Sequence, residues 1–280
     1  MLSQFSGKYR SRWFTSCAAL VLALSCNLGG ATSVQAQSWL ELMFRGIQII
    51  QLSSMSDRQE VSLGRQVNQQ LIQQGQFRPS RNRRLQAYIN EIGQRLAPVS
   101  ARPNVPYTFQ VVEDDAINAF ATMGGFVYIN TGLIAAADNE AELASVIAHE
   151  IAHIADRHAV SRMRDIALSK GLMSATGLQE STAVNLAVQY MVNLPMNRED
   201  ERAADRLGLE NIIRAGYAPE ATVSFMRKLQ QKGGSPPEFL STHPLTQNRV
   251  RDLDRAIPRR YRNWGDGLDP VAYNQRIGRR

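Results

Sequence analysis

Cysteine is almost absent from this sequence of 280 residues, which has only Cys17 and Cys26. We expect residues 1–36 to be a signal peptide, because a basic start precedes the short apolar run Ala18–Leu24 and small residues lie before Gln37. Cleavage there would leave an exported chain without thiols, which depends on no disulfide and offers no thiolate to a metal ion. Any metal site must therefore be built from His, Asp and Glu.

Long uninterrupted hydrophobic runs are also missing. Residues 168–194 are apolar, but Gln179, Glu180 and other polar residues interrupt them too often for a membrane span. The extension 37–55 carries apolar residues at helical spacing, which predicts packing on the domain, with membrane-surface association as the alternative. We expect an exported protein in the periplasm or at the envelope. A lipid anchor on Cys26 is an alternative that the preceding residues support only faintly.

The sequence has fewer acidic than basic residues, which gives it a net charge of +7. Part of this excess lies in the predicted signal peptide, and much of the rest is scattered over the basic C-terminal tail, residues 258–280. No zinc-finger spacing or RNA-binding aromatic pattern accompanies these charges. We therefore expect no nucleic-acid partner, and nothing in the sequence specifies an oligomeric state.

The hydrophobic pattern of residues 56–257 predicts one α+β domain that is mainly helical. Apolar residues with a period of two indicate short strands, and a period near 3.6 indicates helices. Ser56 begins an N-terminal capping box, and glycine and proline mark most helix ends. The tail after Ala256 is expected to be irregular. The expected helices are 57–74, 80–96, 131–137, 139–158, one or two within 168–194, 199–215, 218–231 and 246–256, and the expected strands are 107–112, 118–121 and 126–130.

Residues His149–His153 read His-Glu-Ile-Ala-His, and they lie in an apolar helical run. Two histidines four positions apart project from the same helical face, so both imidazoles can reach one metal ion while Glu150 lies beside them. The surrounding residues are apolar on nearly every side of the helix, so burying two histidines and a glutamate there is costly unless they are paired or metal-bound. This pattern predicts a zinc site with a carboxylate base.

A hydrolytic zinc site needs a third protein ligand. His158 is a poor candidate, because a continuous helix would place it on the face opposite His149; we interpret it as a helix-end residue. The remaining candidates are Glu180, Glu199, Glu201 and Glu210. Glu201 is favoured because Asp205 lies one turn further along the same helical face, where it can hydrogen-bond a ligand imidazole.

Several of these segments together resemble one known family, the CAAX-prenyl-protease-like and HtpX-like zinc metallopeptidases. The similarity extends from about Ser56 to Ala256 and is strongest to the soluble, exported members that act in envelope quality control. It implies a gluzincin fold with a small β-sheet beside the His-Glu-x-x-His helix. The matching segments are Asn118-Ala119-Phe120, Gly124–Asn130, His149–His153, Glu201 with Asp205, and Thr242-His243-Pro244.

The resemblance implies one zinc ion per chain, bound by His149, His153 and Glu201, with Glu150 as the catalytic base. It also implies that His243 lies near the metal, where it would either stabilise an oxyanion or occupy the fourth zinc position as a removable block. The expected activity is hydrolysis of peptide bonds in unfolded or misassembled polypeptides. A non-catalytic, chaperone-like or scaffolding protein with the same fold is the alternative.

Substrate binding is predicted at the segment Gly125-Phe126-Val127-Tyr128, just before the motif helix. We interpret it as an edge strand, to which an extended peptide could add through backbone hydrogen bonds without strong sequence preference.

Overall fold

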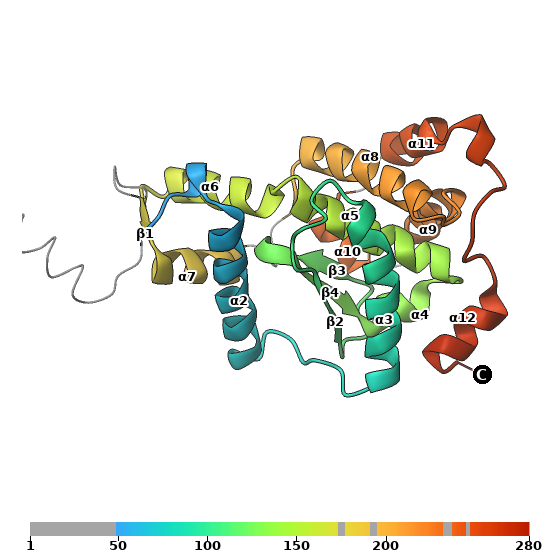
Figure 1. The fold of residues 1–280 in the computed structure, drawn as a ribbon, viewed down its shortest axis with the longest axis horizontal. Helices are drawn as coiled ribbons and strands as arrows, with labels where there is room; N and C mark the ends of the chain where they lie inside the picture. The colour runs from blue at the N-terminus through green and yellow to red at the C-terminus, as the bar shows by residue number, and fades with distance from the viewer. Residues whose placement is uncertain (1–48, 173–176, 191–194, 232–236, 245–246, 280) are drawn as a thin grey trace, which may run out of the picture. The chain divides into compact units, whose positions relative to one another are not determined.

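The structure is a computed structural model that describes residues 49–172, 177–190, 195–231, 237–244 and 247–279. The predicted signal peptide, both cysteines and most of the apolar extension lie outside the described residues. The described part belongs to one unit, Ile49–Arg280. It confirms the α+β class, with many helices around a small mixed sheet (Figure 1). None of its helices is long and apolar enough to cross a membrane.

The sheet contains β2 (Thr108–Val112), β3 (Ala119–Ala121) and β4 (Phe126–Asn130) in the order β2-β4-β3. Strand β4 is therefore central, parallel to β2 and antiparallel to β3. The prediction of an edge strand at Gly125–Tyr128 is wrong. Gly125 precedes the strand in a tight turn, and Phe126, Val127 and Tyr128 are hydrogen-bonded into the middle of the sheet.

A double-glycine turn brings β4 back beside β3. Gly124 and Gly125 have φ values of 76° and 100°, a left-handed region that side chains with a Cβ rarely adopt. A Cβ on Gly124 would also lie 2.7 Å from the backbone oxygen of Glu60. This turn leaves β3 at the edge of the three-stranded sheet in the described part of the chain.

Helix α5 (Glu140–Ala155) carries the His-Glu-x-x-His motif through the main hydrophobic core. It begins where the Asn139 side chain accepts a hydrogen bond from the Glu142 backbone, and almost all of its residues are buried. It packs against α8 (Arg198–Arg214), α9 (Glu220–Gln231), α3 (Arg83–Leu96) and β3. Gly208 lets α8 come close, because a Cβ there would lie 3.3 Å from the His149 backbone. The expected helices around the motif are thus confirmed.

A second hydrophobic cluster lies between α2 (Asp57–Gln73), α6 (His158–Ser169) and α7 (Glu180–Tyr190). The Ser56 capping box that begins α2 is present as predicted, with Gln59 as its partner. The helical spacing of the apolar extension does not continue to its end. Residues Ile49–Ile50 form strand β1, which pairs with β5 (Leu178–Gln179). The motif helix also ends earlier than expected, and α6 is a separate helix that the sequence pattern did not reveal.

A buried carboxylate joins several segments around this second cluster. Glu60 of α2 is 1% exposed and binds Arg102 at 2.9 Å and Arg157 at 3.0 Å. Arg102 also donates to the backbone oxygen of Ile154 near the end of α5. The backbone of Gly124 donates to the same carboxylate at 3.3 Å. Glu60 thereby fixes the glycine turn relative to the motif helix.

The C-terminal region continues through α10 (Glu238–Thr242), α11 (Gln247–Ala256) and α12 (Pro270–Ile277), and α4 spans Thr131–Ala136. The expectation of an irregular tail is wrong for α12. Its Tyr273 is 1% exposed and donates a hydrogen bond to the Ile134 backbone at 2.7 Å. The Gly267 backbone accepts a hydrogen bond from Ala141 at the start of α5. The end of the chain therefore packs on the core rather than extending from it.

Candidate metal centre

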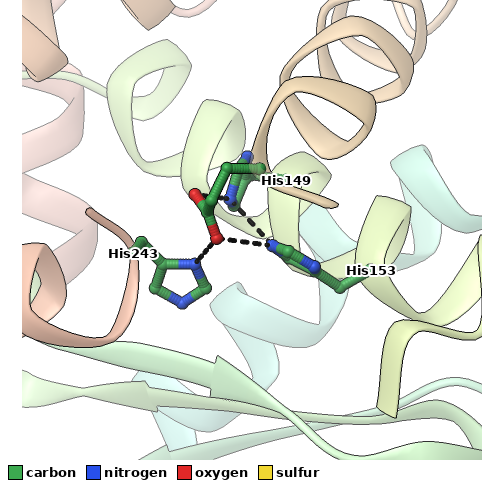
Figure 2. A group of neighbouring side chains, drawn as sticks. His149, His153 and His243 are labelled. Carbon is green, nitrogen blue, oxygen red and sulfur yellow. Dashed lines mark hydrogen bonds and ion pairs between the residues drawn. The ribbon is translucent and has the colours of Figure 1, made fainter. Parts of the chain in front are cut away.

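The two motif histidines point toward the same space beside α5 (Figure 2). His149 and His153 are 4% and 2% exposed, and their Nε2 atoms lie 3.0 Å apart. The spacing of four residues on a regular helix brings them together, as the sequence predicts.

Glu201 projects from α8 toward both histidines. Its Oε2 lies 3.5 Å from His149 Nε2, its Oε1 lies 3.5 Å from His153 Nε2, and its side chain has no exposed surface. His243 adds a further donor, with Nδ1 at 2.9 Å from Glu201 Oε1. The four ligand atoms, one from each residue, all lie within 4.8 Å of one another. The structure thus brings His243 together with the three predicted ligands.

This donor set fits a zinc ion. Nitrogen and carboxylate oxygen from two histidines and a glutamate are typical ligands of hydrolytic zinc, and a fourth position is left for water or another ligand. The Nε2 atoms of His149 and His153 lie 3.0 Å apart, so both can face one cation. The other three glutamate candidates for the third ligand are not part of the group; they are Glu180, Glu199 and Glu210.

The pKa values of the two histidines are shifted in opposite directions in the metal-free chain. Burial alone would lower the pKa of His149, but hydrogen bonds to Asp205 and Glu201 outweigh it and raise the pKa to about 10. Burial lowers the pKa of His153 to about 3, with repulsion from His149 adding to the effect. Without metal, His149 therefore carries a second proton, which a bound metal ion would displace.

Asp205 lies where the sequence predicts, behind His149. Its Oδ1 is 3.4 Å from His149 Nδ1, the ring nitrogen that points away from the metal position. Such a contact fixes the tautomer and orientation of a ligand imidazole.

Arg249 of α11 is a site residue that the sequence analysis missed. It is 4% exposed and binds both oxygens of Asp205 at 2.7 Å. It also lies 2.7 Å from Glu201 Oε2 and donates to the Pro244 backbone oxygen at 2.9 Å. Its position in a charged, mostly exposed helix gave no signal of burial. One arginine therefore holds two carboxylates of α8 and the segment that follows His243.

Glu150 lies beside the ligands with its side chain 1% exposed. Among the described side chains, none donates a hydrogen bond to either of its carboxylate oxygens. Burial raises its pKa, although His243, His149 and the Ala121 backbone oppose the shift. A carboxylate with a raised pKa and free lone pairs is suited to accept and return a proton.

His243 lies directly after α10, between Glu201 and Glu150. Its ring stacks on Phe239 with centroids 4.5 Å apart, and its Nε2 is 3.5 Å from Glu150 Oε1. His158 is buried too, but it lies outside the ligand group, against the far side of His153 at 2.8 Å. The prediction that His158 is not a ligand agrees with this geometry.

Two histidines one helical turn apart, a glutamate from a second helix and a buried carboxylate beside them define a metallopeptidase-type zinc site. Residues 83–257 match the family model described as Peptidase family M48. This chain belongs to peptidase family M48, as the sequence motifs indicated.

Several curated relatives share this region. The "Beta-barrel assembly-enhancing protease" of Escherichia coli (strain K12) is 35% identical over an alignment of 184 residues, and the match covers 60% of this chain and 38% of the relative. The "Mitochondrial metalloendopeptidase OMA1" of Schizosaccharomyces pombe is 27% identical over 177 residues, 61% of this chain and 52% of the relative. The chain spans about half or less of the length of these relatives.

Proposed function

We propose that this chain is an exported zinc-dependent endopeptidase that hydrolyses peptide bonds in misfolded or unassembled envelope proteins. The observation that carries the proposal is the buried group of His149, His153 and Glu201 with Glu150 directly beside it. The name of the Escherichia coli relative, which refers to β-barrel assembly, supports a substrate in the envelope. Export rests on the predicted signal peptide.

His149, His153 and Glu201 would hold the zinc ion, which when bound polarises the scissile carbonyl and lowers the pKa of a water molecule. Glu150 accepts the proton of the attacking water and delivers it to the leaving amine. Asp205 and Arg249 hold His149 and Glu201 in place throughout. Burial of the whole group excludes bulk water and strengthens each of these interactions.

The decisive experiment compares Glu150→Gln with wild type in a casein-cleavage assay on the purified mature chain, together with metal analysis. We expect about one zinc per chain, cleavage that phenanthroline inhibits, and loss of cleavage in the variant with zinc retained. Glu199→Gln, an exposed carboxylate in the first turn of α8, is the matched control and should cleave like wild type. Cleavage by Glu150→Gln at the wild-type rate would refute the mechanism and favour another base. Zinc binding without cleavage by wild type or by His243→Ala would favour the chaperone-like alternative.

We propose that His243 blocks the site in the conformation described here. Its ring lies between Glu201 and Glu150, where the substrate carbonyl and the attacking water must fit, and it offers a fourth nitrogen to the ion. A zinc site with four protein ligands is closed to substrate. His243→Ala should then raise basal cleavage, whereas a lower rate would show that His243 assists the reaction as an oxyanion donor. An unchanged rate would refute both roles.

We propose that the extended substrate adds to β3, in place of the central β4. In the described part of the chain, strand β3 pairs with β4 on one side, and backbone hydrogen bonds at Asn118 and Thr122 leave the peptide groups of Ala119 and Ala121 directed away from β4. The Ala121 backbone also lowers the pKa of Glu150 through a hydrogen bond, so this edge of β3 lies at the site.

Substrate peptides with N-methylated amides test this strand addition without changing the protein. Successive amides of a bound strand point alternately toward and away from β3. Methylation of the amides that point toward β3 should raise KM. Methylation of the alternate amides, which point away from β3, should leave KM nearly unchanged. The same KM for the two sets of methylated peptides would refute strand addition.

A further inference from the structure

His158 is a buried imidazole that the ligand group does not use. Helix α5 ends at Ala155, and Arg157 adopts a left-handed conformation with φ of 56° before α6 begins at His158. This reversal turns the His158 ring toward His153, with centroids 5.0 Å apart, instead of placing it on the opposite face of a continuous helix. His158 is 5% exposed.

The two rings share a hydrogen bond between their Nδ1 atoms at 2.8 Å. One nitrogen must donate and the other must accept. His153 Nε2 faces His149 and Glu201, so this atom must carry the lone pair if it is to bind a cation. The proton of His153 therefore lies on Nδ1, and His158 Nδ1 is the acceptor.

The second nitrogen of His158 completes the arrangement. With Nδ1 accepting, the proton of His158 lies on Nε2, which is 3.3 Å from Asp156 Oδ2 and 3.7 Å from Asp200 Oδ1. Two carboxylates are thus placed to hold that proton, one from the turn between α5 and α6 and one from the first turn of α8. Each proton position follows from the one before it.

We propose that His158 is a positioning residue for the metal ligand His153. It fixes the His153 ring in the tautomer and orientation that direct Nε2 to the metal, and Asp156 and Asp200 fix His158 in turn. This inference rests on the zinc site of the proposed function. The two ligands are then supported differently, since His149 contacts the carboxylate of Asp205 directly, whereas His153 is held through a second imidazole.

Three substitutions at one position separate this role from simple packing. Asn places its Oδ1 acceptor where His158 Nδ1 lies, and so keeps the bond from His153. Gln places its amide near the former Nε2, so it keeps the contact with the carboxylates and loses the bond from His153. Leu fills the space and keeps neither. A purely structural role predicts that Asn, the smallest, is the most harmful.

The measurement is zinc affinity of the metal-free mature chain, by competition with a chromophoric chelator. We expect His158→Gln and His158→Leu to bind zinc about 10- to 100-fold more weakly than wild type, which is the usual effect of removing a partner of a ligand histidine. His158→Asn should stay within about threefold of wild type on the same grounds. Asp165→Asn, an exposed carboxylate on α6, is the control and should bind like wild type.

Circular dichroism of each metal-free variant shows whether it folds, and His158→Gln carries the test if His158→Leu does not. Zinc affinity of His158→Gln equal to that of wild type would overturn the inference, as would a loss in His158→Asn as large as that in His158→Gln. A wild-type chain that binds no zinc would instead overturn the proposed function, and the inference with it.

Discussion

Replacing Arg249 by methionine tests how strongly the metal-free site depends on one buried cation. Methionine keeps most of the apolar stem and removes the guanidinium that binds Asp205 through both oxygens and lies 2.7 Å from Glu201. Removing one partner of a buried ion pair leaves an uncompensated charge and costs about 3 to 5 kcal/mol. We expect the lower end, about 3 kcal/mol, because the protonated His149 still faces both carboxylates.

For a folded unit of this size, that loss lowers the melting temperature by about 6 to 12 °C. The assay is thermal and urea unfolding of the metal-free chain, with Arg251→Met as the control. Arg251 is exposed and hydrogen-bonds the nearby Asn248, so its loss should change the free energy of unfolding by less than about 0.5 kcal/mol. A free energy of unfolding for Arg249→Met within about 1 kcal/mol of the wild-type value would refute the reasoning.

The pH dependence gives an independent check on the same pair. Burial alone would raise the pKa of Asp205, but hydrogen bonds from Arg249 and His149 hold it below its usual range. A depressed pKa in the folded state adds stability that is complete above the unfolded pKa and is lost as the pH falls through the folded value. The stability difference between wild type and Arg249→Met should therefore shrink below about pH 4. A difference that stays constant down to pH 2 would exclude Asp205 as the partner.

Three further predictions concern stability and metal uptake. Glu60→Ala should lower the free energy of unfolding by about 3 kcal/mol, since two arginines lose their shared buried carboxylate, whereas the exposed Asp57→Ala should cost less than about 1 kcal/mol; urea titration compares the two. Zinc uptake at pH 7 should release about one proton, because His149 has a pKa of about 10 without metal and must be neutral to bind; calorimetry in two buffers counts the protons, and a value of zero would be contrary to this. Gly208→Val should cost about 1 to 3 kcal/mol by forcing α8 away from the His149 backbone, and an unchanged melting temperature would show that the helices can separate freely.

Local spacing predicted the parts of the site that lie on single helices. The four-residue interval in His149–His153 and the one-turn interval between Glu201 and Asp205 depend only on helix geometry. The structure confirms that these side chains lie around one site. The role of β4 was mispredicted because a period of two shows that a strand exists but not which strands flank it. Arg249 escaped notice because its partners come from distant segments. The contact of His158 with His153 was not predicted because it depends on a helix break at Arg157.

The metal position also links segments that the chain itself keeps apart. His153 and Glu201 belong to α5 and α8, and α6 and α7 lie between them in the sequence. An ion held by both ligands closes this long stretch into a loop in the folded chain, and because the ligands come together only on folding, its binding stabilises the folded state. Zinc would then serve as a reversible crosslink between α5 and α8, and metal depletion should loosen α6 and α7 before the sheet.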